Sequence, residues 1–141
     1  RKYKPISLIK ISKEKIYNLK KLGLSKQKAL YIRNLSVFFI NNKKRIRQWS
    51  LLNNQIIIDD LIQIKGIGIW TAEMFLIFSL GRSNIFPTKD LGLLKAISIN
   101  YKKKLPIKKP FLKKLEKKWE PWCSVATWYL WRSIDPVNVN Y

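Results

Sequence analysis

The sequence predicts an all-α fold, a helical bundle formed by a single domain over residues 1–141. Apolar residues recur at helical spacing in several segments, and no alternating apolar and polar run is long enough for a useful strand. Capping residues and glycines also fall where these segments begin and end. With 47% hydrophobic residues, the chain has enough apolar side chains for one core. It has no apolar run of the roughly 20 residues that span a bilayer.

Two helices are expected before residue 41. Ser12 is placed to cap a helix over residues 13–21, and Gly23 follows it where a left-handed terminator is expected. Ser25 is placed to cap the next helix, which continues to about Ile40 and ends in a basic bend.

The middle of the chain predicts a helix-hairpin-helix motif at about residues 55–80. A helix over residues 55–63 leads into the turn Gly-Ile-Gly at 66–68. A nearly all-apolar helix follows over residues 69–80, and we expect it to be central in the core. Gly81 ends it.

Three further helices complete the predicted fold. Thr88 is placed to cap a helix over residues 89–99, and a lysine-rich connector follows. The last two helices are expected at 111–119 and 122–134. Three tryptophans in this region are interpreted as packing residues: Trp119, Trp122 and Trp128.

The charge is strongly unbalanced. Lys and Arg total 29 against 8 Asp and Glu, which gives a formal net charge of +21. This excess indicates a polyanionic partner, most simply nucleic acid. An anionic membrane surface is the weaker alternative, because no basic amphipathic helix has an otherwise free apolar face. Most lysines after residue 101 are expected on solvated helix faces, and a subset would add affinity through counterion release.

The reactive side chains are few. The chain has no His and one cysteine, Cys123, which excludes an internal disulfide, a four-cysteine iron–sulfur cluster and a His/Cys zinc site. General acid or base chemistry that uses His is excluded as well. Cys123 is interpreted as a packed residue, because no neighbour in the sequence supplies it with a base.

The glycine turn is a candidate phosphate site. Two glycines allow positive φ and leave amide groups open at the start of a helix. The residues expected to bind a DNA phosphate are Lys65, Gly66, Ile67, Gly68 and Thr71. The alternative is a plain turn between two helices, in which the glycines serve close packing.

Backbone carbonyls on the approach to the turn give the only cofactor expectation. The carbonyls of Ile62, Ile64 and Ile67 could hold a monovalent cation, Na⁺ or K⁺, that bridges to the same phosphate. No other cofactor is expected.

Two of the eight carboxylates differ from the rest. Six sit among polar or basic neighbours or near the chain end, and are interpreted as surface charges: Glu14, Asp59, Asp60, Glu116, Glu120 and Asp135. Glu73 lies on the apolar helix, where it could be a buried ion-pair partner. Asp90 opens a helix beyond the glycine turn. The residues alone leave open whether Asp90 is functional or is a helix-start carboxylate favoured by the macrodipole.

Four segments in order resemble the helix-hairpin-helix (HhH-GPD) DNA glycosylases of base-excision repair, in the DNA-3-methyladenine glycosylase II branch. These segments are distributed through nearly all of the chain: LGLSKQKALYIRNL (22–35), LIQIKGIGIWTAEMF (61–75), FPTKDLGLLKA (86–96) and WEPWCSVATWYLWR (119–132). The resemblance implies that Asp90 is the catalytic aspartate. It also implies hydrolysis of the N-glycosidic bond of alkylated bases such as 3-methyladenine, with Asp90 stabilising the cationic sugar and orienting water.

The resemblance also implies a monofunctional enzyme and a base pocket. Bifunctional members place a Schiff-base lysine where this chain has Trp70, and an indole cannot attack C1′, so no lyase activity is expected. Trp70, Met74 and Trp131 correspond to positions that line the pocket for the flipped base. Indoles suit a cationic base through cation–π attraction. Trp131 remains nearly as well explained as a core residue.

The resemblance sets the remaining expectations. The partner is double-stranded DNA that contains alkylated bases, the chain is a monomer, and its location is the bacterial cytoplasm, associated with the nucleoid through DNA. The chain starts at Arg1, near the middle of a typical member, so an N-terminally truncated protein is expected. The alternative function is a noncatalytic helix-hairpin-helix DNA-binding module or an inactive fragment.

Overall fold

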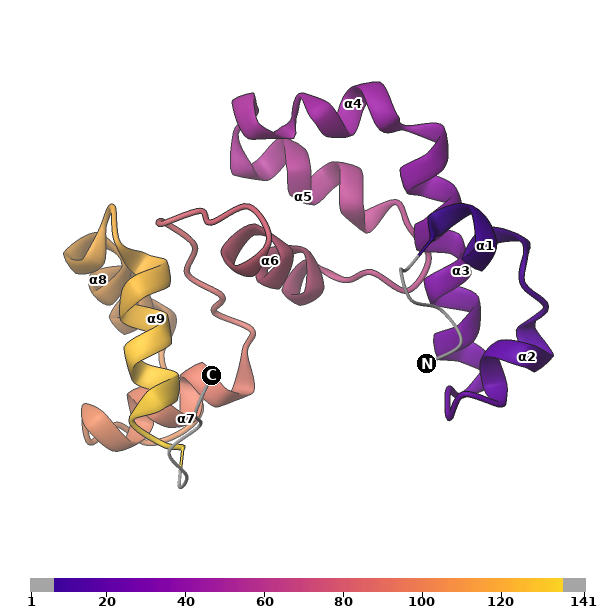
Figure 1. Cartoon of the computed structure of the whole chain (residues 1–141). Helices are drawn as coiled ribbons and strands as arrows, with labels where there is room; N and C mark the ends of the chain where they lie inside the picture. Colours follow the sequence, from indigo (N-terminus) through magenta and orange to yellow (C-terminus); the bar gives the residue numbers. More distant parts are fainter. Residues whose placement is uncertain (1–6, 136–141) are drawn as a thin grey trace. The chain divides into compact units, whose positions relative to one another are not determined.

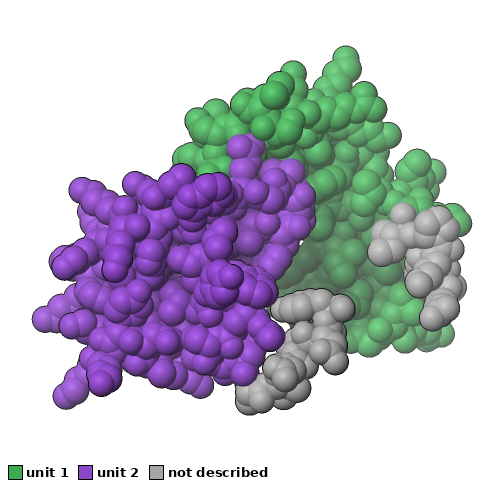
Figure 2. Space-filling view, turned by 60° about the vertical axis from the view of Figure 1, so that its left-hand side comes forward, with its two compact units in different colours: residues 1–72 green, residues 73–141 purple. Residues whose placement is uncertain are grey.

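The computed structural model describes residues 7–135, and all regular elements in this range are helices (Figure 1). The predicted all-α class is therefore confirmed. The chain divides into two compact units, an N-terminal unit of residues 1–72 and a C-terminal unit of residues 73–141 (Figure 2). The expectation of a single domain over residues 1–141 stays a prediction. No helix among the described residues is long and apolar enough to cross a membrane.

The N-terminal unit is built around one long helix, α3, against which α1 and α2 pack. Its helices are α1 (Leu8–Lys13), α2 (Ile16–Lys20), α3 (Lys26–Asn41), α4 (Lys43–Arg47), a 3₁₀ helix (Trp49–Leu51) and α5 (Asn54–Ile62). The basic bend expected after α3 is thus a short helix followed by a 3₁₀ turn. The buried apolar residues of this unit include Leu19, Ala29, Trp49, Ile57 and Leu61.

The prediction of one helix capped by Ser12 is wrong. Ser7 is the N-cap of α1 and accepts a hydrogen bond from the Lys10 amide. Ser12 lies inside α1, where its hydroxyl donates to the Ile9 carbonyl at 3.0 Å. The chain is extended at Glu14, whose carboxylate accepts hydrogen bonds from the Lys15 amide and from the Asn18 side chain. These bonds compete with helix continuation and separate α1 from α2.

The signals at the start of α3 are confirmed. Gly23 has a φ of 90°, in the left-handed region, and ends α2. Ser25 caps α3 and accepts a hydrogen bond from the Lys28 amide at 3.2 Å. These signals depend only on neighbouring residues, so the sequence could predict them without any knowledge of packing.

Asp60 is not a simple surface charge. Its carboxylate accepts a hydrogen bond from the Arg45 guanidinium at 2.8 Å and another from the Trp49 indole at 2.9 Å. Burial raises the pKa of Asp60, but the two hydrogen bonds and the charge of Arg45 together outweigh it, so the pKa lies below 3.8. The carboxylate therefore ties α5 to the short helices that precede it.

The C-terminal unit is formed by α7 (Leu91–Asn100), α8 (Lys109–Trp119) and α9 (Cys123–Arg132), with the greater part of α6 (Ile69–Phe78). Helices α7 and α8 both pack against α9. Their shared core consists of Phe86, Leu93, Ala96, Ile97, Ile107, Leu112, Leu115, Cys123 and Leu130. Burial raises the pKa of the Cys123 thiol to about 11, so its interpretation as a packed, unreactive residue is confirmed.

Helix α6 is less central than its composition suggests. Ala72 and Leu76 are fully buried, but Trp70 is 48% exposed and Phe78 is 65% exposed. One stripe of the helix packs inward and the opposite side reaches solvent. An all-apolar sequence has no periodicity that could have distinguished these two sides.

Two of the three tryptophans assigned to packing are exposed. Trp119 does pack on the core, with its ring edge-on to Phe86 at 5.4 Å. Trp122 is 61% exposed and Trp128 is 39% exposed, so the packing interpretation is wrong for both. They line a surface hollow of about 600 Å³.

Candidate phosphate-binding turn and carboxylate centre

The turn between α5 and α6 is closed by its own backbone. The Ile64 amide donates to the Leu61 carbonyl at 3.0 Å, and the Ile67 amide donates to the Ile64 carbonyl at 2.9 Å. The Gly68 carbonyl then accepts the first hydrogen bond of α6, from Ala72. The chain therefore reverses within a few residues and presents the start of α6 directly after the second glycine.

Gly66 is required at its position for two reasons. Its φ is 105°, a conformation that L residues with a side chain rarely adopt. A Cβ atom at this position would also overlap the ring of Tyr31, which comes from α3. The Tyr31 hydroxyl in turn accepts a hydrogen bond from Gln27, which holds the ring over the turn. Close packing therefore accounts for the first glycine.

Gly68 differs from Gly66. Its φ is not positive, so the expectation that both glycines use this freedom is wrong for Gly68. No atom lies within 4 Å of a Cβ built on it. Neither backbone strain nor a neighbour in the structure explains this glycine. A missing side chain on an exposed backbone does allow close approach of a ligand.

The start of α6 supplies the amides of the candidate phosphate site. The first amides of any helix lack acceptors within that helix and carry the positive end of the helix dipole. The Ile67 amide is already used inside the turn, which leaves the glycines and the first turn of α6 as donors. Lys65 and Thr71 are both exposed beside them. The structure thus brings the predicted phosphate-binding residues together at one turn.

The carbonyl oxygens assigned to a monovalent cation flank the same turn. The Ile64 carbonyl already accepts the Ile67 amide, and its second lone pair is the one a cation would use. No cluster of His, Cys, Asp or Glu that could hold a metal occurs in the described part of the chain. The cation therefore stays a prediction that rests on backbone oxygens.

Positive charge extends from the turn onto α3. Two surface hollows, of about 460 and 300 Å³, share Lys65 as a lining residue. Arg33 lines the larger and Lys26 the smaller, and no Asp or Glu lines either. The sequence could not connect these two α3 cations to the turn, because the connection depends on how α3 packs.

Asp90 is the N-cap of α7 and is 9% exposed. Its Oδ1 accepts hydrogen bonds from the Leu93 amide at 2.6 Å and from the Trp131 indole at 2.8 Å. The prediction that Thr88 caps this helix is wrong, because the helix begins at Leu91, directly after Asp90. The capping account of Asp90 is correct, but it leaves the indole contact unexplained.

Trp131 links Asp90 to α6. Its ring stacks on Phe78 with centroids 5.9 Å apart and planes 17° apart, while its indole N–H points at Asp90. Gly92 leaves room for this arrangement, since a Cβ there would lie 3.2 Å from Asp90 Oδ1 and 3.6 Å from the Trp131 ring. Phe78 and Gly92 were not among the predicted site residues. The glycine two residues after Asp90 was the one available signal.

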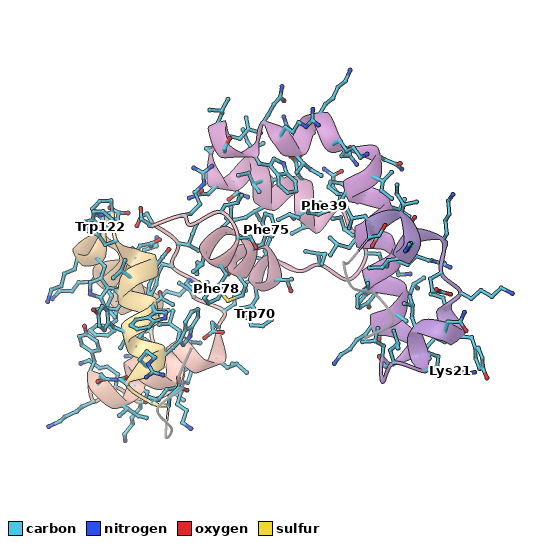
Figure 3. All side chains as sticks on the ribbon, viewed as in Figure 1. Lys21, Phe39, Trp70, Phe75, Phe78 and Trp122 are labelled. Atoms are coloured by element: carbon cyan, nitrogen blue, oxygen red, sulfur yellow. The ribbon has the colours of Figure 1, made fainter. Side chains whose placement is uncertain are left out.

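Trp70 and Met74 both lie on α6, which Figure 3 shows with Trp70, Phe75 and Phe78 labelled. Trp70 is 48% exposed and Met74 is half-buried. A half-exposed indole offers a ring face to a ligand, which a core tryptophan does not. The assignment of Trp70, Met74 and Trp131 to a base pocket stays a prediction.

Glu73, also on α6, has an unusual carboxyl group. Burial, the largest cause, raises its pKa, Lys89 lowers it and Asp90 raises it, with a result of about 7 against an ordinary value of 4.5. Its Oε2 atom is buried without a hydrogen-bond partner. Glu73 forms no ion pair within the described residues, so the ion-pair interpretation is wrong. Such a carboxyl group keeps its proton at pH values well above those at which an exposed glutamate ionises.

The chain matches known proteins along most of its length. A family model described as "HhH-GPD superfamily base excision DNA repair protein" matches residues 1–121. YfjP of Bacillus subtilis is 36% identical over 84% of this chain and 41% of its own length. DNA-3-methyladenine glycosylase 1 of Schizosaccharomyces pombe is 42% identical over 58% of this chain and 36% of its own. The chain thus spans less than half the length of these two relatives.

A solved structure gives the same match in three dimensions. The 3-methyladenine DNA glycosylase Mag1 of Schizosaccharomyces pombe, in complex with abasic DNA, superimposes with a TM-score of 0.79 at 28% identity. The match covers 93% of this chain and 68% of that one.

Proposed function

We propose the function of this chain from the family to which it belongs: it is a member of the HhH-GPD superfamily of base excision DNA repair proteins. Its activity is hydrolysis of the N-glycosidic bond between an alkylated base, such as 3-methyladenine, and deoxyribose in double-stranded DNA. The named relatives are DNA-3-methyladenine glycosylases. The observation that carries the proposal is the geometry of Asp90, a nearly buried carboxylate held by two N–H donors.

The glycine turn binds the DNA backbone in this proposal. A phosphate accepts hydrogen bonds from the amides at the start of α6, and the absent side chain of Gly68 lets it approach. Lys65 adds charge. A Na⁺ or K⁺ ion, held by backbone carbonyls, would neutralise the same phosphate. None of these contacts reads a base, so they hold DNA of any sequence.

Asp90 acts on the sugar of a nucleotide flipped out of the duplex. As the base leaves, C1′ gains positive charge, and a carboxylate held in place stabilises it without reorganisation. The Leu93 amide and the Trp131 indole fix the position of the carboxylate through Oδ1. An alkylated purine that is already cationic departs without a proton donor, so one carboxylate suffices for such substrates.

The proposed enzyme has no lyase activity through the turn, because Trp70 stands where a Schiff-base lysine would be. It acts as a monomer. A noncatalytic DNA-binding module is the second candidate, because the turn and the basic hollows need no Asp90 to bind DNA.

Release of free 3-methyladenine from methylated duplex DNA, compared between wild type and Asp90→Asn, tests the proposal. Asparagine keeps an oxygen that can cap α7 and accept the Trp131 indole bond, and it removes only the charge. We expect release to fall by about 100-fold or more. Asp59→Asn, at an exposed site of the other unit, makes the same charge change and should release base at the wild-type rate.

The outcomes separate the two candidates. Salt-sensitive DNA binding with no base release by the wild type would establish the noncatalytic module. Equal release by wild type and Asp90→Asn would remove Asp90 from its assigned role.

A further inference from the structure

Glu73 is the carboxyl group that the proposed mechanism leaves without a role. It is half-buried on α6, and its Oε2 atom has no hydrogen-bond partner in the described part of the chain. Leaving a buried ionised oxygen without a donor is costly, so this environment favours the neutral acid. A neutral carboxyl group carries a proton that it can donate.

The charged groups that act on Glu73 are Lys89 and Asp90, from the segment that leads into α7. Burial, the largest cause, raises the pKa of Glu73, Lys89 lowers it and Asp90 raises it, and the result is about 7. Asp90 Oδ1 accepts hydrogen bonds from the Leu93 amide and the Trp131 indole, whereas Glu73 Oε2 accepts none in the described part of the chain. Two interacting carboxyl groups in such different environments are the pattern of a proton donor beside an anionic stabiliser.

The register of α6 places Glu73 with a predicted pocket residue. Glu73 follows Trp70 by three residues, and residues at this spacing are neighbours on one helix face. Trp70 is half-exposed and is the indole assigned to the base. The acid therefore lies on the α6 face that the departing base is expected to contact.

We propose that Glu73 donates a proton to the departing base, so that this chain also releases uncharged purines, which leave poorly without one. The inference rests on the proposed function. The carboxyl proton moves to a ring nitrogen of the base while the C1′–N9 bond breaks. The electron pair of that bond stays on the departing base. Water then adds its hydroxide to C1′ and returns a proton to the Glu73 carboxylate, so the step is balanced.

Two substrates that differ in the charge of the leaving base test this role. Duplexes containing hypoxanthine, which is neutral, and 7-methylguanine, which is cationic, are compared with wild type and Glu73→Gln between about pH 5.5 and pH 8.5. We expect Glu73→Gln to lose about 100-fold on hypoxanthine at the acidic end and less than 3-fold on 7-methylguanine. Wild-type hypoxanthine release should fall as the pH rises through about 7.

Glutamine matches the shape of the neutral acid, so the variant is expected to fold. Glu116→Gln, at a half-buried site on α8 of the same unit, is the matched control and should leave both rates unchanged. Equal losses on the two bases, or no loss on hypoxanthine, would overturn the inference while 7-methylguanine release still supported the proposed function. Release of neither base by wild type would instead overturn the proposed function and this step with it.

Titration of the Glu73 carboxyl carbon by NMR gives a second readout that needs no activity. We expect a midpoint near pH 7 in the wild type and a lower midpoint in Asp90→Asn, because the like charge is removed. A midpoint near 4.5 in the wild type would overturn the inference whatever the rates.

Discussion

At the scale of single residues, the two glycines of the turn have separate explanations. The fold itself requires glycine at position 66, because φ is positive there and the ring of Tyr31 leaves no room for a Cβ atom. Gly68 has neither constraint. Because the fold does not require a glycine at position 68, we explain it by close approach of a ligand, which here is the proposed phosphate.

Alanine substitutions separate these explanations. Gly66→Ala should lower the free energy of unfolding by about 2 kcal/mol or more, because it adds backbone strain and displaces Tyr31. Gly68→Ala should lower the free energy of unfolding by less than about 1 kcal/mol, since it changes only the residue that precedes α6. Its affinity for duplex DNA should nevertheless fall about 10-fold. Urea unfolding and fluorescence anisotropy measure the two effects, and wild-type DNA affinity in Gly68→Ala would contradict the phosphate assignment.

At the scale of elements, short helices depend on polar contacts at their ends. Among its described residues, the N-terminal unit has three elements of five residues or fewer, α2, α4 and the 3₁₀ helix, which are too short to be stable alone. The Asp60 carboxylate holds two of them to α5 through Arg45 and Trp49. Such a contact joins neighbouring elements and also makes their stability depend on pH.

Asp60→Asn should therefore destabilise the chain at neutral pH by about 1 kcal/mol, a modest figure because Arg45 is partly exposed. The pKa of Asp60 in the folded chain lies below 3.8, so its contribution is fully present above pH 3.8 and is lost as the pH falls through the folded value. Urea unfolding of wild type and variant across this range should converge at the acidic end. A constant difference down to about pH 2 would show that the charge is not the cause.

At the scale of the whole molecule, the dominant property is the charge of +21. On the N-terminal unit it is organised, because Lys26, Arg33 and Lys65 line two hollows that contain no acid. In the proposed complex, a DNA strand held at the turn would lie beside these three cations. On that view, the affinity for DNA comes from several phosphates and is strongly dependent on salt.

Replacing Arg33 by glutamine should weaken duplex binding about equally for any sequence. It should also reduce the slope of log K against log salt by about 1 if one phosphate contact is lost. Lys28→Gln is the control, because Lys28 lies on the same helix but lines neither hollow. Anisotropy titrations over a series of salt concentrations give both slopes, and equal slopes for the two variants would place the DNA away from this face.

Local signals were sufficient for much of this protein. Helical periodicity, the serine before α3, the turn of Gly66 and Gly68, and the position of Asp90 are properties of neighbouring residues, so they can be read without a fold. The cap assigned to Ser12 was wrong because Ser7 caps the helix that contains Ser12. The cap assigned to Thr88 was wrong because the Asp90 carboxylate takes that role. Several capping residues in a short stretch leave the boundary undecided.

The sequence by itself therefore determined the helical class, the glycine turn and the carboxylate at position 90. Only the tertiary structure decided the surroundings of that carboxylate: the Trp131 indole 41 residues away, the stacked Phe78 ring, and the burial that changes the acidity of Glu73. It also decided that Trp122 faces solvent. Helix class and caps arise from contacts between near neighbours, whereas burial, stacking and charge coupling arise from residues that only packing brings together.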